Sequence, residues 1–154
     1  MQVQEVMTPS PCACGPGANL SEAIQMMWEG DFGILPVVDD VGHVLGIVTD
    51  RDIAIAAGTR NVPASEIPVS DVMTREVQVC HPHNGIPAAL ALMRERRVRR
   101  LPVVDDEDRL CGLLSLNDAV LAAGDGVSGK TLVDTLRAVC EHRRPSPTPL
   151  VTAA

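Results

Sequence analysis

The six-residue sequence LPVVDD, at residues 35–40, decides the fold because it occurs a second time at residues 101–106. Aligned with the same offset and without a gap, residues 7–58 and 73–124 share 18 identical residues in 52 positions. Residue frequencies of roughly 7% each would produce only about four identities by chance. The chain is therefore an internal duplication, and each copy is one structural unit of about 50 residues.

Each copy carries the pattern of the same short elements. Apolar residues spaced i, i+3, i+4 and i+7 from Leu20, and again from Ile86, predict an amphipathic helix in each copy. Asn19, followed three residues later by Glu22, predicts a capping pair at the first of these helices. Two runs rich in β-branched residues follow each helix and are separated by acidic turns, which predicts a β-hairpin and then a second helix. In the first copy, the hairpin strands are predicted at residues 34–38 and 44–48 and the second helix at 53–57. In the second copy, the hairpin strands are predicted at 101–104 and 110–114 and the second helix at 119–123. Ahead of the first helix of each copy, residues 8–14 and 74–80 have room for one short leading strand.

A unit of this size cannot bury both faces of a sheet alone, but two copies packed together can. We therefore predict an α+β fold in which two β-α-β-β-α repeats, related by a pseudo-twofold axis, pack sheet to sheet and precede a C-terminal helix. The predicted boundaries are 1–58 for the first repeat, 59–71 for a linker, 72–124 for the second repeat, 125–142 for the helix and 143–154 for a flexible Pro-rich tail.

The composition is typical of a soluble globular protein, with 45% hydrophobic and 21% charged residues among 154. No apolar run approaches the roughly 18–20 residues of a membrane span, and the first residues lack the basic start and apolar stretch of a signal peptide. Five cysteines are an odd number, which fits reduced thiols better than a disulfide framework. We expect a cytoplasmic protein with no membrane partner.

The sequences GIVTDRD, residues 46–52, and GLLSLND, residues 112–118, follow the two LPVVDD sequences. With a helix ahead of each, this arrangement resembles a tandem CBS-domain pair (a Bateman module) over residues 6–124. The chain length and the C-terminal helix resemble stand-alone bacterial CBS-pair proteins of the hypoxic-response type. The resemblance implies a regulatory module, not an enzyme, that needs no cofactor and binds an adenosine compound (AMP, ADP, ATP or S-adenosylmethionine) between its repeats. It also implies a homodimer formed through the repeat helices and an unknown regulated protein.

Two pairs of residues are the candidate ligand contacts. We name Thr49 with Asp52 the first site, and Ser115 with Asp118 the second site. Within the resemblance, the aspartates accept hydrogen bonds from the ribose, since an ionised carboxylate is an acceptor for both hydroxyls. The hydroxyl of Thr49, at a helix start, can hold a phosphate or ribose oxygen. The alternative is that both aspartates cap helix starts, where Asp is common.

The two copies differ just before the proline of LPVVDD. Arg99 and Arg100 stand there in the second copy, and Gly33 and Ile34 stand there in the first. In related modules, basic residues at these positions reach the phosphate of a nucleotide whose ribose the other repeat holds, and arginine binds phosphate bidentately. We therefore predict that the first site, completed by Arg99 and Arg100, binds anions better than the second. The alternative is a solvated basic face favoured by the helix dipole.

Aromatic residues are scarce, since Trp28 and Phe32 are the only two. Modules that stack single-stranded bases on several aromatic rings cannot be built from this inventory. The net charge of -7 also argues against a binder of phosphate backbones, so we expect no nucleic-acid partner. The same scarcity means that adenine would be held by the backbone or by aliphatic side chains. The candidates are Ile34, Val37 and Val103.

A P-loop expression, GDGVSGKT, occupies residues 124–131. A functional P-loop lies between a buried strand and a helix in a parallel sheet. Here a repeat helix precedes the glycines, so we interpret them as a turn at a helix end, with Ser128 capping the last helix.

Two short clusters combine thiols and imidazoles: Cys12 with Cys14, and Cys80 with His81 and His83. The repeat offset pairs Cys14 with Cys80, and these ligand types suit zinc. Their spacing is unlike the C-x₂-C of structural zinc sites, and small buried cysteines are common. We assign no metal, with a zinc ion or a redox disulfide as the alternative.

A second class of function stays open beside ligand sensing. The chain could be a protein–protein interaction scaffold whose clefts have lost their ligand. The uncharged residues before the first LPVVDD proline favour that alternative for one of the two clefts.

Overall fold

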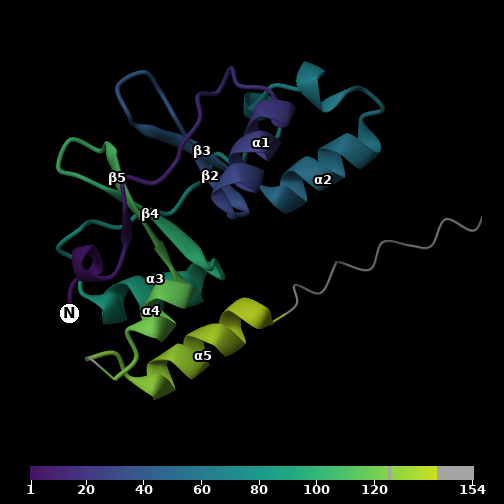
Figure 1. Cartoon of the computed structure of the whole chain (residues 1–154). Coiled ribbons are helices and arrows are strands. Elements are labelled where there is room, and N and C mark those ends of the chain that lie inside the picture. The colour runs from purple at the N-terminus through teal and green to yellow at the C-terminus, as the bar shows by residue number, and fades with distance from the viewer. Residues whose placement is uncertain (125, 142–154) are drawn as a thin grey trace, which may run out of the picture.

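The computed structural model describes residues 1–124 and 126–141 (Figure 1). The first repeat contains α1 (Leu20–Gly30), the hairpin β2 (Ile34–Val38) and β3 (Val44–Thr49), and α2 (Asp50–Thr59). The second repeats this order with α3 (Ile86–Arg96), β4 (Arg100–Val104), β5 (Leu110–Ser115) and α4 (Leu116–Leu121). A short strand β1 (Thr8–Pro9) precedes them and α5 (Gly129–Cys140) follows, with single 3₁₀ turns at Val3–Glu5, Ala64–Glu66 and Val69–Asp71.

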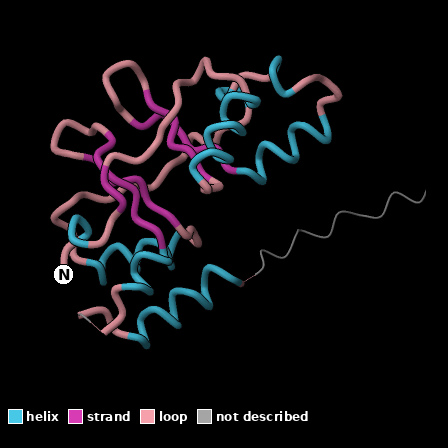
Figure 2. Tube along the Cα trace, viewed as in Figure 1, coloured by secondary structure: helices cyan, strands magenta, loops and turns pink. Residues whose placement is uncertain are grey.

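The tandem α+β repeat predicted from the sequence is confirmed. Figure 2 shows the strands of both repeats facing the middle of the molecule, with α1 and α2 on one outer side and α3, α4 and α5 on the other. The two hairpins have the same register, with Ile34 opposite Thr49 and Arg100 opposite Ser115. No helix in the described part of the chain is long and apolar enough to cross a membrane.

Local sequence signals set where the first helix begins and ends. Asn19 Oδ1 accepts a hydrogen bond from the backbone N–H of Glu22 at 3.0 Å, and Glu22 Oε2 accepts one from the backbone N–H of Asn19 at 2.8 Å. This is the predicted capping box, which satisfies two N–H groups that have no partner within the helix. The helix ends at Asp31 in the left-handed conformation, φ 52°, and α3 ends in the same way at Arg97, φ 54°.

Of the stretches 8–14 and 74–80, each predicted to have room for one short strand, the first contains β1 and the second forms single bridges at Thr74 and Cys80. We call residues 3–14 and 69–80 the leading segments. Thr8–Pro9 pairs with β5 of the second repeat, while Thr74 pairs with Ile47 of the first repeat. Only farther along does each segment join its own repeat, through single bridges at Cys14 and Cys80. The first leading segment therefore adds a third strand to the sheet of the second repeat, and the second leading segment forms a bridge to β3 of the first.

The hydrophobic core of each repeat also contains residues from the segment that precedes the other repeat. Buried residues of the described chain form two clusters, one per repeat. Val3, at the start of the chain, is fully buried in the core of the second repeat. Ile67 and Val69, which precede the second repeat, are buried in the core of the first. The end of the segment predicted as a linker, 59–71, therefore packs inside the fold.

Helix α5 covers one repeat only. It packs on α3 and α4 and buries Leu132 and Thr135 there. The hydroxyl of Thr135 donates to the carbonyl oxygen of Thr131 at 2.8 Å, so no buried polar group is left unpaired at this contact. The predicted tail, residues 143–154, lies outside the described residues.

Candidate functional site

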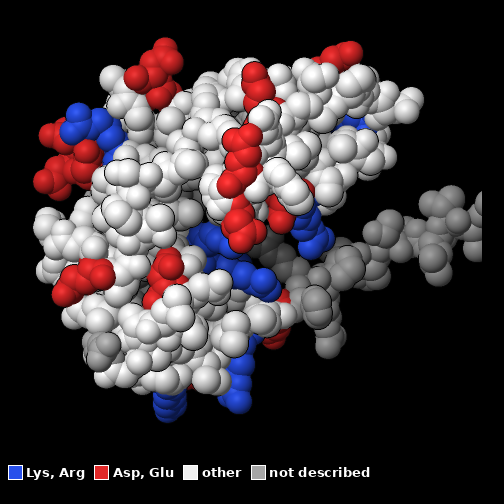
Figure 3. All heavy atoms as spheres, in the orientation of Figure 1, with Lys and Arg blue, Asp and Glu red and all other residues white. Residues whose placement is uncertain are grey.

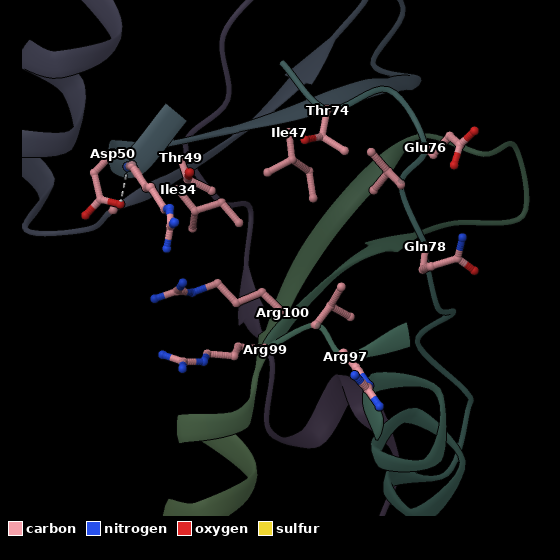
Figure 4. Close-up of a pocket in the computed structure, with 14 residues that line it drawn as sticks. Ile34, Ile47, Thr49, Asp50, Thr74, Glu76, Gln78, Arg97, Arg99 and Arg100 are labelled. Carbon is pink, nitrogen blue, oxygen red and sulfur yellow. Dashed lines mark hydrogen bonds between the residues drawn. The ribbon is translucent and has the colours of Figure 1, made fainter. Parts of the chain in front are cut away.

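A cavity of about 510 Å³ lies between the two repeats (Figure 4). Three parts of the chain surround it: the strand ends of the first repeat, the second leading segment and the loop that joins α3 to β4. The residues on its wall are Gly33, Ile34, Ile47, Thr49, Asp50, Arg51, Thr74, Glu76, Val77, Gln78, Arg97, Val98, Arg99 and Arg100. Because the second leading segment crosses to the first repeat, it forms one side of this cavity.

The first site is organised as a capping box at the start of α2. Thr49 Oγ1 donates to Asp52 Oδ2 at 2.7 Å, and the backbone N–H of Thr49 donates to the same oxygen at 3.0 Å. The backbone N–H of Asp52 in turn donates to Thr49 Oγ1 at 3.2 Å. Thr49 lies on the cavity wall, whereas Asp52 does not. The capping role, an alternative from the sequence, is therefore present in this structure.

The second site has nearly the same geometry at the start of α4. Ser115 Oγ donates to Asp118 Oδ2 at 2.7 Å, and the backbone N–H of Asp118 donates to Ser115 Oγ at 3.1 Å. Ser115 lies in a smaller cavity of about 220 Å³, which Leu136 and Cys140 of α5 help to line. The chemistry of the two sites is alike, so their difference lies in the surrounding walls.

Arg99 and Arg100 lie on the wall of the large cavity and also on the wall of the small one. Figure 4 shows both side chains extending in the same direction, to the side of the cavity on which Asp50 lies. Among residues 1–124 and 126–141, no carboxylate forms an ion pair with either guanidinium. Two adjacent unpaired guanidinium groups beside a cavity are suited to an anion, which arginine can grip bidentately.

The charge around the large cavity is positive although the whole chain is acidic. Four arginines line it against two acids, Asp50 and Glu76. Figure 3 shows blue side chains gathered in the hollow between the two halves of the molecule. A cleft in which one sign of charge predominates raises the local concentration of ions of the opposite sign.

The apolar candidates divide between the cavity and the cores. Ile34 lies on the cavity wall, as expected. Val37 and Val103 do not, because both are fully buried in the hydrophobic cores of their repeats. Ile47 and Val77 supply apolar wall in their place. Ile47 alternates with the buried Gly46 and Val48 along β3, but the continuous apolar sequence of this strand gives no signal that could have identified it.

Two arginines on the cavity wall were missed from the sequence. Arg51 follows Thr49 at the first turn of α2, and Arg97 occupies the left-handed position that ends α3. The cluster of five arginines between residues 94 and 100 was visible, but spacing alone did not say which members face the cavity.

The P-loop expression lies in a turn. Helix α4 precedes it, and Gly124 and Gly126 take the left-handed conformation, with φ 101° and 100°. Ser128 is the N-cap of α5, but its side chain makes no capping hydrogen bond. No strand leads into the glycines, and residue 125 lies outside the described residues.

The cysteines are separate thiols in this structure. Burial raises the pKa of Cys14 and raises that of Cys80 to about 11, which disfavours the thiolate that binds metal. The imidazoles of His81 and His83 lie instead near the carbonyl oxygen of Val104 and the amide of Gln4. Among the described residues, no three His, Cys, Asp or Glu side chains are grouped as metal ligands.

Comparison with known families gives two matches to one domain. The model of the CBS domain matches residues 3–58 and 69–125. The CBS domain-containing protein YhcV of Bacillus subtilis is 34% identical over 116 residues, which are 75% of this chain and 81% of YhcV.

Solved structures of similar shape are also paired domains. The CBS domain pair of protein MJ0100, in complex with 5'-methylthioadenosine and S-adenosyl-L-methionine, has a TM-score of 0.73 and 25% identity, covering 81% of this chain and 97% of that one. Hypoxic Response Protein I with two coordinated zinc ions has a TM-score of 0.72 and 26% identity, covering 79% and 98%. CBSX2 of Arabidopsis thaliana, in complex with AMP, has a TM-score of 0.68 and 28% identity, covering 79% and 95%.

Proposed function

The chain belongs to the CBS-domain family as a tandem pair, and we propose that it is a regulatory module that binds an adenosine nucleotide in the large cavity and signals to a partner protein. One observation carries the proposal: Arg99 and Arg100, free of ion pairs in the described chain, lie on the same cavity wall as the hydroxyl-bearing helix start at Thr49. The complexes of MJ0100 and CBSX2 with adenosine compounds support it.

The cavity can receive a nucleotide in a definite orientation. The phosphate lies against Arg99 and Arg100, where bidentate charge-assisted hydrogen bonds are available. Thr49, at the start of α2, lies on the same cavity wall, and the positive end of the helix dipole favours an anion there. Adenine lies on the apolar wall of Ile34 and Ile47. This arrangement needs no aromatic ring.

The ribose requires a local exchange of hydrogen bonds at Asp52. One carboxylate oxygen, Oδ2, already accepts two hydrogen bonds from Thr49. The second oxygen makes no hydrogen bond to the described residues and is available to a ribose hydroxyl. Because Asp52 does not line the cavity in this structure, its carboxylate would reach the ligand by rotating toward the cavity, which would exchange capping hydrogen bonds for bonds to the ribose.

The first site is proposed as the main binding site of the pair. Its cavity is more than twice as large as that of the second site, about 510 Å³ against 220 Å³. Both cavities share Arg99 and Arg100, so an anion bound in one draws on the same guanidinium groups as an anion in the other. We therefore expect one phosphate-bearing ligand per chain, and a phosphorylated ligand in preference to the cationic S-adenosylmethionine.

A homodimer is part of the same proposal, and the helices of the first repeat offer the surface for it. Ile24 and Trp28 on α1 are 42% and 85% exposed, whereas Leu90, which occupies the position of Ile24 in the second repeat, is 1% exposed beneath α5. An uncovered apolar helix face of this kind marks an interaction surface. We propose cytoplasmic location and a non-enzymatic role with it.

Titration calorimetry with AMP, ATP and adenosine tests the binding proposal. Replacing both Arg99 and Arg100 with Ala should weaken ATP binding at least tenfold and leave adenosine binding nearly unchanged. Asp52→Ala should weaken all three ligands more than Asp118→Ala does. Arg109→Ala, which removes one positive charge from the β4–β5 hairpin outside the cavity wall, serves as the control. Absence of any nucleotide binding by the unmodified protein would favour the scaffold function instead.

A further inference from the structure

Helix α5 is connected to the large cavity by one ion pair. Arg97 lies on the cavity wall, and its Nη2 donates to Oε2 of Glu141 at 3.0 Å. Glu141 caps the C-terminal end of α5, 44 residues farther along the chain. The pair therefore joins the loop that carries Arg99 and Arg100 to the last turn of a helix outside the repeats.

The side chain of Arg97 points away from the two other arginines of that loop. Figure 4 shows Arg99 and Arg100 extending together across the cavity, while Arg97 extends to the opposite side, along α3. Its position in the left-handed conformation, φ 54°, ends α3 and places it directly before the cavity segment. Arg97 thus lines the cavity, while its guanidinium is turned away from Arg99 and Arg100 and paired with a carboxylate of this chain.

We propose that Arg97 is a further phosphate-binding residue of the cavity, and that a nucleotide polyphosphate displaces Glu141 from it and so frees the last turn of α5. The proposal rests on the proposed nucleotide function and names the element that responds to the ligand. It also names the ligand class, because adenosine has no phosphate with which to compete.

The charges favour this exchange. Both partners of the Arg97–Glu141 pair are exposed, with 43% of the Arg97 side chain and 65% of the Glu141 side chain accessible to solvent. Surface ion pairs of this kind contribute about 0–1 kcal/mol to stability. A phosphate group carries more negative charge than a carboxylate and offers more acceptor oxygens to the guanidinium fork. A triphosphate already anchored on Arg99 and Arg100 is therefore the stronger partner for Arg97.

The last turn of α5 can respond without unpacking the rest of the helix. The buried residues of α5, Leu132 and Thr135, lie in its first two turns, whereas Cys140 and Glu141 are exposed. Leu136 and Cys140 also line the small cavity beside Arg99 and Arg100. Movement at this end would therefore alter the second site and the surface around it while the α3 contact stays intact.

Coupling of this kind is reciprocal, so removing the competing carboxylate should tighten ligand binding. With the full chain, Glu141→Gln should bind ATP about two- to fivefold more tightly than the unmodified protein, in proportion to an exposed ion pair. Adenosine binding should not change. Asp134→Asn removes the same charge from the same helix without a pairing to Arg97, and should leave ATP binding nearly unchanged.

Hydrogen exchange of the backbone amides at residues 137–141 gives a second readout. ATP should increase exchange there in the unmodified protein, whereas Glu141→Gln should exchange fast with or without ATP. If Glu141→Gln and Asp134→Asn bind ATP alike, and ATP leaves α5 exchange unchanged, the role of Arg97 is refuted although nucleotide binding stands. If ATP, AMP and adenosine all fail to bind the unmodified protein, the proposed function itself fails, and this inference fails with it.

Discussion

Gly46 lies in close contact with the backbone of the second leading segment, and we expect its replacement by alanine to destabilise the packing between the two repeats. A Cβ at this position would lie 2.8 Å from the carbonyl oxygen of Thr74 and 2.8 Å from Sδ of Met73. The methionine side chain can move aside, but the carbonyl belongs to the backbone. Its neighbours fix it, since Ile47 N–H donates to Thr74 O at 2.9 Å and Thr74 N–H donates to Ile47 O at 2.8 Å.

The loss of stability expected for Gly46→Ala can be estimated from these contacts. Insertion of a methyl group into a packed interior costs about 1–3 kcal/mol. Moving Thr74 away weakens two inter-repeat hydrogen bonds, each of which contributes about 0.5–1.5 kcal/mol. We expect a loss of roughly 2–4 kcal/mol in the free energy of unfolding, which corresponds to a fall of about 5–15 °C in Tm for a chain of this size. Thr74 also lines the large cavity, so ATP affinity should fall as well.

Thermal and urea unfolding, followed by circular dichroism, measure this loss. Gly58→Ala is the matched control, because Gly58 lies in α2 and no atom comes within 4 Å of its added Cβ. That change should be neutral or stabilise by about 0.5–1 kcal/mol, as alanine does in a helix. A Gly46→Ala protein as stable as the Gly58→Ala protein would show that the close approach of Thr74 is not needed by the fold.

Three further outcomes are expected. His43 Nδ1 lies 2.9 Å from Asp39 Oδ2, and this pairing raises the pKa of His43 above its usual 6.5. The stabilisation that this pair gives the folded protein is therefore complete below about pH 6.5 and is lost as the pH rises through the raised pKa. The difference in Tm between the unmodified protein and His43→Gln should shrink over that range. Burial raises the pKa of Cys80 to about 11, so at pH 8 a thiol reagent should modify exposed Cys12 much faster than Cys80, as peptide mass mapping would show. Asn19→Ala removes the N-cap of α1 and should cost about 1 kcal/mol in urea unfolding; an unchanged midpoint would contradict the capping role.

The duplication and the helix starts could be predicted because they depend on neighbours in sequence. Identity at a fixed offset needs no structure, and the pair of Asn19 with Glu22 acts within one turn. The partner of β1 could not be predicted in this way. Thr8 and Pro9 are exposed, so they have no hydrophobic alternation to indicate a partner sheet, and they pair with residues about 100 positions away.

The candidate site was predicted in part for a similar reason. Arg99, Arg100 and Thr49 were identified by chemistry and position, and the structure brings them to one cavity. Val37 was proposed as a candidate adenine contact, but it is fully buried in the core of its repeat, because its strand, β2, is buried on both faces. A continuous apolar run of this kind gives no period-two signal to separate core positions from cavity positions.

The exchange of leading segments also has a consequence for the order of folding during synthesis. Thr8 pairs with Leu113, which the ribosome adds about 100 residues later. At roughly 5–20 residues per second, the strand partner of the first leading segment is absent for about 5–20 s. Val3 packs in the core of the second repeat, so its packing partners are also absent during this interval. The first repeat can close its own core only after Ile67 and Val69 emerge, so neither half of the duplication is a complete folding unit during translation.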